Sequence, residues 1–365
     1  MKIHHLLPGR AEHHIPAMIR FFARIHERLG AADAEPVFVF YDATPAQIAR
    51  YRALLPGGCE SIALRRGRVP VFRYVWGFSG RDALVLHSAF YPWLWLSLLA
   101  RPGLWERSAW IMWGADIYGR RTLRGRVYRV IKGFVVKRLG GVSALVPGDF
   151  DDLQRLIGPC PNYIRAFYSP DYGELPAGAR DGGGTTRVIL GNSAWEQSNH
   201  VQALQWLGRF RDKPVEVICP LGYPKESPYK SEVISAGGRL LGERFRPLPE
   251  MVGWDDYNAL LATCHVLVLN SLNQQGLGNL YCMLRAGAKI YIRGDCAIFR
   301  MLTEMGFSVY DTRDLERISF EEFADYTAEN AQRNRQLFEE NLSAEASIDN
   351  WLALLRKLGV AKAAA

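Results

Sequence analysis

The sequence predicts an α/β protein with two domains, each built on a parallel β-sheet. The chain has 365 residues, of which 48% are hydrophobic, and this is enough for about two domains with separate cores. Short apolar runs alternate with helical patterns in both halves, which is typical of parallel strands covered by helices. Residues 170–184 are rich in Pro, Gly and Ala, as linkers often are. We therefore expect domains over residues 1–175 and 185–365, the second ending in helices.

The first half contains the strands and helices of one such sheet. Strands are expected over 1–7, 37–41, 84–87, 109–113 and up to 145–147, with helices over 18–29 and 46–55. Polar residues occur just after several of these strands, at His14, His87, Asp116 and Asp149. Because open parallel sheets bind ligands at the carboxyl ends of their strands, we expect these side chains to line a crevice.

The second half repeats the alternation after the linker. Strands are expected over 187–190, 215–219, 239–241, 265–269 and 289–292, with helices over 198–209, 227–236, 254–263 and 278–286. The residues from Ser319 to Leu358 are helical in pattern. Beyond the similarity of the two halves we find no internal repeat.

Two glycine-containing turns of the second half indicate a ligand. One, over residues 191–199, follows an apolar strand and enters a helix, and the other, over residues 274–278, does the same. Such turns leave backbone N–H groups free at a helix N-terminus, which suits a phosphate. Each alone is typical of an ordinary strand-to-helix turn, but together they predict a diphosphate held between two loops.

Charge is unevenly distributed along the chain. Residues 1–180 contain 25 Lys and Arg against 14 Asp and Glu, whereas the remainder contains 20 against 23. The formal net charge of +8 therefore arises from the first half, which points to an anionic surface or substrate there. A non-catalytic nucleic-acid binder is a remote alternative, because the basic half shows no recognised nucleic-acid motif and the predicted phosphate loops lie in the other half. We expect no nucleic-acid partner.

The segment 119–138 carries eight Lys or Arg residues and no acidic residue. Its apolar residues recur at helical spacing, which fits either a helix lying on an anionic membrane or a surface helix with an apolar core face. The membrane contacts predicted by the first reading are Arg120, Arg121, Arg124, Arg126, Arg129 and Lys132. The apolar stretch 89–100 is too short to span a bilayer, and a buried helix is favoured over one that touches lipid. The first ten residues contain no long apolar run, so no signal peptide is expected.

The cysteines and acidic pairs do not predict a metal site. The six Cys are scattered without metal-binding spacing and are typical of reduced core residues in a cytosolic protein. Asp149-Phe150-Asp151 superficially matches the Asp-x-Asp of metal-dependent transferases. Since Asp149 follows Pro-Gly and precedes Phe150, we interpret it as a helix N-cap instead.

Several blocks of this sequence, taken in order, resemble one known family. The blocks are His13-His14 running into Arg20-Phe21-Phe22, His87 with Pro92-Trp93-Leu94-Trp95-Leu96, Trp113-Gly114-Ala115-Asp116-Ile117-Tyr118, Gly191-Asn192-Ser193 with Ser198-Asn199, Pro220-Leu221-Gly222-Tyr223-Pro224, and Gln274-Gln275-Gly276-Leu277-Gly278. They resemble glycosyltransferase family 56, the TDP-N-acetylfucosamine:lipid II N-acetylfucosaminyltransferases of enterobacterial common antigen synthesis. The family's Gly-Asp-Arg-Ser-Asn is drawn out here over residues 193–199, so contacts with the donor sugar are expected to differ.

The resemblance implies a GT-B architecture, with two Rossmann-like domains facing across a cleft and C-terminal helices. It implies an inverting transfer of 4-acetamido-4,6-dideoxygalactose from a TDP-sugar to lipid II, a polyprenyl-diphosphate-linked saccharide, with no metal or further cofactor. The first domain would bind the acceptor and face the membrane, and the second would bind the nucleotide sugar. The protein would then lie peripherally on the cytoplasmic face of the inner membrane.

The candidate catalytic residues are His14, Asp116 and His87. An inverting transfer needs a base near the acceptor hydroxyl. His14 is favoured for this role. Asp116 is an alternative base or a group that orients the histidine, and His87 is the next candidate. The residues expected to bind the donor are Gly191, Asn192, Ser193, Ser198, Asn199, Gly222, Tyr223, Gln274, Gln275, Gly276, Gly278 and Asn279.

The second glycine turn also bears on the identity of the nucleotide. Many GT-B enzymes have Glu-Gly-x-Gly followed by a Glu that binds the ribose diol, whereas Gln275 replaces the first acid here and no carboxylate lies near Met283 or Leu284. The loss of that group fits a nucleotide without a 2′-hydroxyl and so favours a thymidine donor. A transferase that uses a UDP- or GDP-sugar for another lipid-linked or lipopolysaccharide sugar remains the alternative.

Overall fold

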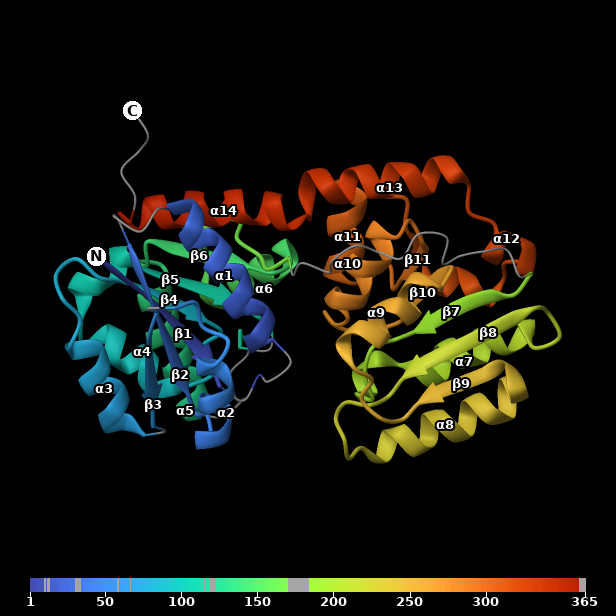
Figure 1. Cartoon of the computed structure of the whole chain (residues 1–365), viewed down its shortest axis with the longest axis horizontal. Coiled ribbons are helices and arrows are strands. Elements are labelled where there is room, and N and C mark those ends of the chain that lie inside the picture. The colour runs from blue at the N-terminus through green and yellow to red at the C-terminus, as the bar shows by residue number, and fades with distance from the viewer. Residues whose placement is uncertain are drawn as a thin grey trace. The chain divides into compact units, whose positions relative to one another are not determined.

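The computed structural model describes residues 1–9, 11, 14–29, 34–57, 59–65, 67–114, 116–117, 123–169 and 184–360. The chain divides into two compact units, the first comprising Met1–Asp171 with Ala344–Ala365 and the second Tyr172–Ser343 (Figure 1). Within the described residues, each unit contains one six-stranded sheet whose strands are all parallel. The predicted α/β class is confirmed.

The sheet of the first unit has the strand order β3-β2-β1-β4-β5-β6. Its strands are β1 (Lys2–Pro8), β2 (Glu35–Tyr41), β3 (Glu60–Leu64), β4 (Ala83–His87), β5 (Ser108–Met112) and β6 (Gly141–Ala144). The central strands are almost entirely buried because helices cover both faces of the sheet. The expected strands are found at their places, except that β6 ends before residue 145, and β3 was not predicted.

Two groups of helices cover the two faces of this sheet. The helices are α1 (Ile15–Leu29), α2 (Pro45–Arg52), α3 (Arg68–Trp76), α4 (Pro92–Leu99), α5 (Leu123–Val136), α6 (Pro147–Ile157) and α14 (Ala344–Lys357), with a 3-10 segment η1 (Pro102–Arg107) before β5. Helices α3 to α6 contribute to one apolar core, and α1, α2 and α14 contribute to the other. In α4, Leu94, Trp95 and Leu98 are buried, so the stretch 89–100 forms largely a core helix.

The final helix belongs to the first unit, which corrects the expected boundary of the second domain at residue 365. Helix α14 packs against α1 and buries the apolar stripe that includes Ile348, Trp351 and Leu355. The Trp351 indole N–H donates to the carbonyl of Phe167 at 2.8 Å. The sequence predicts the helix from its periodicity, but it does not show which sheet receives the apolar stripe.

The sheet of the second unit has the strand order β12-β11-β10-β7-β8-β9. Its strands are β7 (Thr186–Leu190), β8 (Val215–Pro220), β9 (Phe245–Leu248), β10 (Val266–Leu269), β11 (Lys289–Ile292) and β12 (Tyr310–Asp311). The helices and 3-10 segments are η2 (Glu196–Ser198), α7 (His200–Leu207), η3 (Gly208–Phe210), α8 (Pro228–Leu241), η4 (Gly242–Arg244), α9 (Trp254–Ala262), α10 (Leu277–Arg285), α11 (Ala297–Glu304), η5 (Thr312–Glu316), α12 (Phe320–Ala324) and α13 (Ala328–Asn341). The expected linker lies outside the described residues, apart from Gly184.

The expected strand over residues 239–241 is wrong, because these residues form the end of α8. The helix continues through the pair Gly237 and Gly238. A Cβ on Gly237 would stand 2.3 Å from the ring of Phe245, so glycine is needed here for the close approach of β9 to the helix. The strand itself begins four residues later, at Phe245.

All six cysteines are free thiols, and five of them are buried. Across the part of the chain that the structure describes, no helix combines the length and apolar character needed to cross a bilayer.

Candidate active site

His14 and Trp113 meet at the carboxyl edge of the first sheet. His14 directly precedes α1, and its carbonyl accepts the backbone N–H of Met18 at 3.0 Å in the first helical turn. Its exposed imidazole packs edge-on against the indole of Trp113, with ring centroids 5.5 Å apart. Trp113 is the first residue after β5. The structure therefore joins the β1–α1 loop to the end of β5, while His13 lies outside the described residues.

Tyr168 connects this pair to His87. The Trp113 indole N–H donates to the Tyr168 hydroxyl at 3.4 Å, and the same hydroxyl lies 2.6 Å from Nδ1 of His87. His87 is the last residue of β4 and is fully buried, and burial lowers its pKa to about 3. His87 is therefore neutral near pH 7 and reaches the edge of the sheet only through Tyr168, a residue that sequence reasoning missed.

Two further histidines extend this contact into the core. Nε2 of His87 lies 3.0 Å from Nδ1 of His5, and Nε2 of His5 lies 3.0 Å from Nε2 of His26. Burial lowers the pKa of His26 to about 4, and burial together with the neighbouring imidazoles lowers the pKa of His5 well below its usual range. We call His26, His5 and His87 the histidine chain. The sequence held a hint of this arrangement. Adjacent residues of a strand point to opposite faces of the sheet, so His4 and His5 of β1 must enter different cores.

Asp116 occupies a different position in the site from the one expected for a base. Its carboxylate is buried and accepts three N–H groups: those of Trp113 and Ala89 in the backbone, at 2.8 and 2.9 Å, and that of the Trp110 indole at 2.9 Å. Two of these partners follow β4 and β5 directly, and the third, Trp110, lies within β5. The geometry fits a group that fixes the two loops rather than one that takes a proton from a ligand.

The structure corrects one of the predicted membrane contacts, that of Lys132. Its side chain is buried and donates to the carbonyl of Asp116 at 2.5 Å, and its ammonium lies 4.1 Å from the centroid of the Trp110 ring. Burial lowers its pKa to about 8. The side chain of Lys132 is therefore part of the interior of the first unit and cannot contact a membrane.

The remaining side chains of α5 place both charge and apolar surface on the outside. Arg126 is exposed and Arg129 is partly exposed. Val127, Val130 and Phe134 are 55%, 73% and 44% exposed, so part of the apolar surface of this helix is turned to solvent. Arg120 and Arg121 lie outside the described residues, and the structure does not describe the side chain of Arg124.

Asp149 is not the N-cap that its sequence context predicts. Helix α6 begins at Pro147 with Val146 as its N-cap, so Asp149 lies in the first turn. Burial, followed by the nearby carboxylates of Asp152 and Asp116, raises its pKa to about 7. In the part of the chain that the structure describes, no group of three or more His, Cys, Asp or Glu side chains is arranged to hold a metal ion.

In the second unit, the two glycine turns lie against each other. Gly191 follows β7, and Gly276 is the N-cap of α10 with a φ of +77°. A Cβ on Gly276 would lie 3.2 Å from Oδ1 of Asn192, so the first turn touches the second. Asn279, in the first turn of α10, donates from Nδ2 to the carbonyl of Gly191 at 3.0 Å. These contacts hold both turns at the carboxyl ends of β7 and β10.

Side chains bridge the same two turns farther out. The Ser198 hydroxyl donates to Oε1 of Gln275 at 3.0 Å, and the backbone N–H of Leu272 donates to the carbonyl of Gln197 at 2.8 Å. Asn199 adopts a left-handed conformation, with a φ of +51°, and so turns the chain from η2 into α7. Gln274 is partly buried beside this bridge, and Gly278 is exposed in the first turn of α10.

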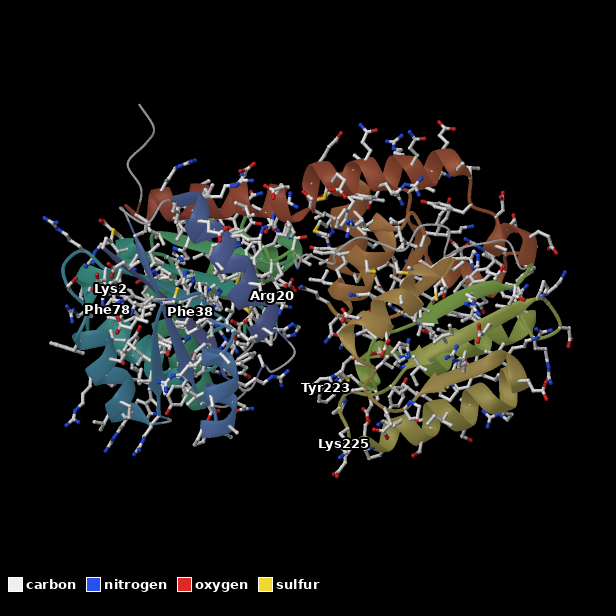
Figure 2. All side chains as sticks on the ribbon, viewed as in Figure 1. Lys2, Arg20, Phe38, Phe78, Tyr223 and Lys225 are labelled. Carbon is white, nitrogen blue, oxygen red and sulfur yellow. The ribbon has the colours of Figure 1, made fainter. Side chains whose placement is uncertain are left out.

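A third loop joins this group through the backbone. The N–H of Ala194 donates to the carbonyl of Tyr223 at 2.6 Å, which ties the first turn to the loop after β8 that contains Gly222. The rings of Trp195 and Tyr223 are both 44% exposed and meet edge-on at 6.1 Å. Tyr223 and Lys225 lie on the same loop of the second unit (Figure 2). The exposed aromatic pair offers a surface on which a base or sugar can stack.

Several buried polar atoms in these loops have no partner among the described residues. They are Oδ1 of Asn192 and the hydroxyls of Ser193 and Ser271. Buried polar atoms are normally hydrogen-bonded, so unsatisfied ones in a loop cluster indicate a place for a ligand. Arg293, which follows β11, was missed by sequence reasoning and donates to Oε1 of Gln202 at 3.2 Å. Its guanidinium also forms an ion pair with Asp295, with Nε 2.9 Å from Oδ1.

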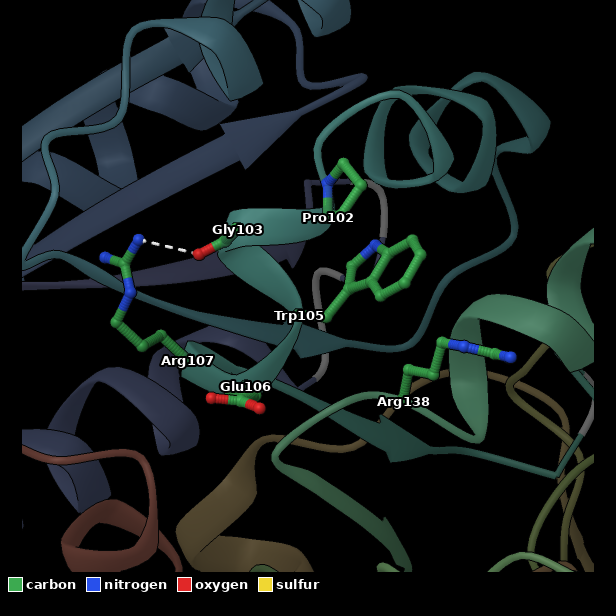
Figure 3. A pocket seen from close by; sticks show the side chains of 6 residues that line it. All are labelled: Pro102, Gly103, Trp105, Glu106, Arg107 and Arg138. Carbon is green, nitrogen blue, oxygen red and sulfur yellow. Dashed lines mark hydrogen bonds between the residues drawn. The ribbon is translucent and has the colours of Figure 1, made fainter.

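Two hollows of the first unit lie outside these groups. The larger, of about 570 Å³, is lined by Pro102, Gly103, Trp105, Glu106, Arg107 and Arg138 (Figure 3). These residues precede β5 and β6 and thus lie at the amino edge of the sheet, away from the edge where such sheets bind ligands. The smaller, of about 120 Å³, lies at the carboxyl edge and is lined by Tyr41, Asp42, Arg65, Val71, Phe90 and Tyr91.

Comparison with known proteins agrees with this arrangement. Residues 1–357 match the model of a family described as 4-alpha-L-fucosyltransferase, glycosyl transferase group 56. The fold is similar to that of a glycosyltransferase from Rickettsia africae, with a TM-score of 0.72, 8% identity and 98% of each chain covered. Sucrose-phosphate synthase from Thermosynechococcus elongatus gives a TM-score of 0.73 at 12% identity, covering 99% of this chain and 100% of that one.

A third similar structure is that of Anabaena HepE in complex with UDP and glucose. Its TM-score is 0.71 at 11% identity, with 98% of this chain and 99% of that chain covered. At such low identities the likeness concerns the fold alone. Together with the two parallel sheets and the C-terminal helices, it shows that the architecture is GT-B.

Proposed function

This chain belongs to the 4-alpha-L-fucosyltransferase family, glycosyl transferase group 56, and is a glycosyltransferase; we propose that it transfers 4-acetamido-4,6-dideoxygalactose from a TDP-sugar to lipid II. The acceptor is then a polyprenyl-diphosphate-linked saccharide, and the product belongs to a polysaccharide of the enterobacterial common antigen type. The proposal rests on the family, on the loops of the second unit as the candidate donor site, and on the carboxyl edge of the first sheet as the candidate acceptor site.

The contact between the two glycine turns of the second unit carries the proposal. The N-terminus of α10 and the turn after β7 lie against each other, where Asn192 and Ser193 leave polar atoms unsatisfied. A diphosphate would accept from backbone N–H groups of the turns and from the Ser193 hydroxyl. Ser198 and Gln275 would hold the loops in register through their own hydrogen bond.

The preference for thymidine follows from the interior of α10. By its spacing from the second glycine turn, the ribose-binding carboxylate of many GT-B enzymes would fall near Met283 or Leu284, and both residues are fully buried. Because no acidic side chain is available at this position, a ribose 2′-hydroxyl would not increase the affinity of the site for the nucleotide. The exposed pair of Trp195 and Tyr223 is our candidate for stacking against the thymine ring.

The acceptor chemistry belongs to the edge of the first unit. His14 takes the proton of the acceptor hydroxyl, whose oxygen forms a bond to the anomeric carbon of the donor. The bond from that carbon to the diphosphate breaks on the opposite side, TDP leaves with the electron pair, and the configuration inverts. Asp116 acts as a positioning residue, because its carboxylate holds the backbone of Trp113, against which His14 packs.

We further propose that α5 rests on the cytoplasmic surface of an anionic membrane, where a polyprenyl-linked acceptor would be found. Its exposed Val127, Val130 and Phe134 would enter the interface while the arginines contact lipid phosphates. The basic charge of the first half supports this orientation.

Calorimetric titration with TDP, UDP and GDP tests the donor assignment directly. TDP is expected to bind most tightly, and an Asn192→Ala variant is expected to weaken its binding. A transfer assay with the TDP-sugar and lipid II would then be expected to release TDP and extend the acceptor. Tighter binding of UDP or GDP would instead support a transferase for another lipid-linked or lipopolysaccharide sugar.

A further inference from the structure

One hollow of the first unit contains a buried hydroxyl without a partner. It is the smaller of the two hollows, of about 120 Å³, and Tyr41 at the end of β2 is one of its lining residues. Tyr41 is 8% exposed, and its Oη has no hydrogen-bond partner among the described residues. Buried polar atoms are normally hydrogen-bonded, so this hydroxyl indicates a place for a polar group of a ligand.

Ser88, the residue after β4, supplies a second such hydroxyl. Its side chain is fully buried, and its Oγ also lacks a partner in the part of the chain that the structure describes. Burial, followed by the nearby carboxylates of Asp116 and Asp42, raises the pKa of Tyr41, and the nearby Ser88 hydroxyl opposes this rise. The phenol therefore stays protonated near pH 7, and the two hydroxyls do not meet with hydrogen-bond geometry. A ligand hydroxyl placed between them would accept from one and donate to the other.

Two residues beside the hollow have a backbone conformation that is uncommon outside glycine. Asp42, which lines the hollow, has a φ of +58°, and Ser88 has a φ of +67°. Such left-handed residues cost free energy and cluster at ligand sites. Within the described residues only one other non-glycine residue, Asn199 in the candidate donor loops, has a positive φ. These positions therefore lie at the two places where substrates are expected.

The side chains that line the hollow fit a sugar better than a phosphate. Phe90 is 52% exposed, so its ring offers an apolar face on which a sugar can pack. Asp42 and Arg65 line the hollow with opposite charges, so a diphosphate would meet a carboxylate as well as a guanidinium. The volume is below the roughly 300–1,000 Å³ of common ligand pockets, so the hollow admits one sugar ring at most.

The hollow flanks the strand that leads to the proposed base. In the sheet, β1 lies between β2, which ends at Tyr41, and β4, which ends directly before Ser88. The loop after β1 begins at Gly9, whose N–H donates to the carbonyl of Tyr41 at 2.7 Å, and it ends at His14. Neighbouring strands are about 4.8 Å apart, so the ends of β2 and β4 are separated by about 10 Å. A sugar bound between them therefore lies next to the loop that carries His14.

We propose that this hollow is a sugar subsite for the acceptor, in which the hydroxyls of Tyr41 and Ser88 bind a hydroxyl group of the acceptor saccharide and Phe90 packs against the sugar ring. The subsite rests on the proposed function, because it assigns a position to the saccharide of lipid II. Its role is to select and orient the sugar, and no bond is formed or broken there. An acceptor without the matching hydroxyl would leave both side chains unpaired and would be rejected.

The first arm of the test compares two tyrosines whose buried hydroxyls lack partners among the described residues. Tyr41→Phe removes the hydroxyl at the hollow, whereas Tyr163→Phe removes one beside β6, away from the lining residues. Both variants should keep or raise the urea midpoint, because an unpaired buried hydroxyl destabilises the folded state. Tyr41→Phe should raise the KM for lipid II by roughly 2- to 10-fold, as for one lost hydrogen bond, with kcat nearly unchanged. Ser88→Ala should act in the same direction, and Tyr163→Phe should keep the wild-type KM.

The two measurements together separate a binding role from a structural one. A hydroxyl that only supports the fold would lower the urea midpoint when it is removed, and any loss of acceptor binding would follow from that loss of stability. Tyr41→Phe with a wild-type KM, or with a lowered urea midpoint, would overturn the subsite.

The second arm measures binding without transfer. Calorimetry in detergent micelles compares lipid II with a polyprenyl diphosphate that lacks the saccharide. Tyr41→Phe should weaken the binding of lipid II and leave that of the polyprenyl diphosphate unchanged. Equal weakening of both would place the diphosphate of the carrier in the hollow and overturn the sugar assignment. A wild-type protein that does not bind lipid II would overturn the proposed function, and the subsite with it, before any variant is compared.

Discussion

The carboxylate of Asp116 fixes the backbone of Trp113, whose N–H it accepts at 2.8 Å immediately after β5. The other carboxylate oxygen accepts the backbone N–H of Ala89 and the indole N–H of Trp110. One side chain thus holds the ends of two neighbouring strands in position. This makes Asp116 a determinant of the shape of the site, and it separates its role from that of His14.

Asp116→Asn is therefore expected to destabilise the first unit. An amide has one acceptor oxygen in place of two, so at least one buried N–H loses its partner. Such a loss costs about 1–3 kcal/mol in the free energy of unfolding, which urea titration would measure. Asp152→Asn is a matched control, because the ion pair of Asp152 with Arg155 is at the surface and should contribute little. Equal stability of both variants would contradict the assigned role.

His14→Ala is expected to affect the rate and not the fold. Its side chain is exposed, so the free energy of unfolding should change little. Loss of a general base lowers kcat by roughly 10²- to 10⁴-fold. TDP affinity should stay at the wild-type value, because the proposed donor contacts are in the second unit. Near-full turnover would rule His14 out as the base and leave Tyr168 with His87 as the next candidate.

Gly276→Ala is expected to weaken nucleotide binding. A residue with a Cβ at a φ of +77° is strained by about 1–2 kcal/mol, and the new methyl would press on Asn192 at 3.2 Å and on Leu269 at 3.0 Å. The turn would have to move away from its partner. Gly238→Ala is the control, because a Cβ there meets nothing within 4 Å and lies inside α8. Calorimetry with TDP should show weaker binding for Gly276→Ala and no change for Gly238→Ala.

Charge reversal on and before α5 is expected to release the protein from anionic liposomes. Each basic side chain near such a surface contributes about 1 kcal/mol. The variant carries Glu at Arg120, Arg121, Arg124 and Arg126. A control with the same change of charge carries Glu at four exposed positions of the second unit, Arg211, Arg239, Arg244 and Arg317. Sedimentation with liposomes should distinguish them, and release of both variants alike would indicate attraction by net charge only.

Stability is expected to decline in mild acid. The folded-state pKa values of His26, His87 and His200 are lowered to about 4, 3 and 4, below the ordinary value of 6.5. Between these limits the unfolded chain binds protons that the folded chain does not, so the contribution of these three histidines to stability is full above pH 6.5 and falls as the pH drops. Each group contributes up to about 1.4 kcal/mol per pH unit. Urea midpoints from pH 7.5 to 4.5 should show the decline, and His26→Gln should make it less steep.

Local patterns determined much of the fold in advance. The alternation of apolar runs and helical periodicity predicted both parallel sheets and placed most strands within a residue or two, because the burial of a parallel strand on both faces leaves a clear run of apolar residues. The errors arose where distant contacts override local signals. Residues 239–241 were expected to form a strand but end α8, where the ring of Phe245 packs in the place that a Cβ on Gly237 would take.

The candidate site shows the same difference between what local patterns predict and what distant contacts decide. The sequence located His14, the end of β4 and both glycine turns, because polar residues after apolar strands lie at the carboxyl edge of a sheet. The sequence could not show that Lys132 points inward, because the direction of its side chain depends on contact with the ring of Trp110. It also could not show that Tyr168 joins His87 to Trp113, or that α14 returns to the first unit. These relationships join residues far apart in the chain, so only the tertiary structure decided them.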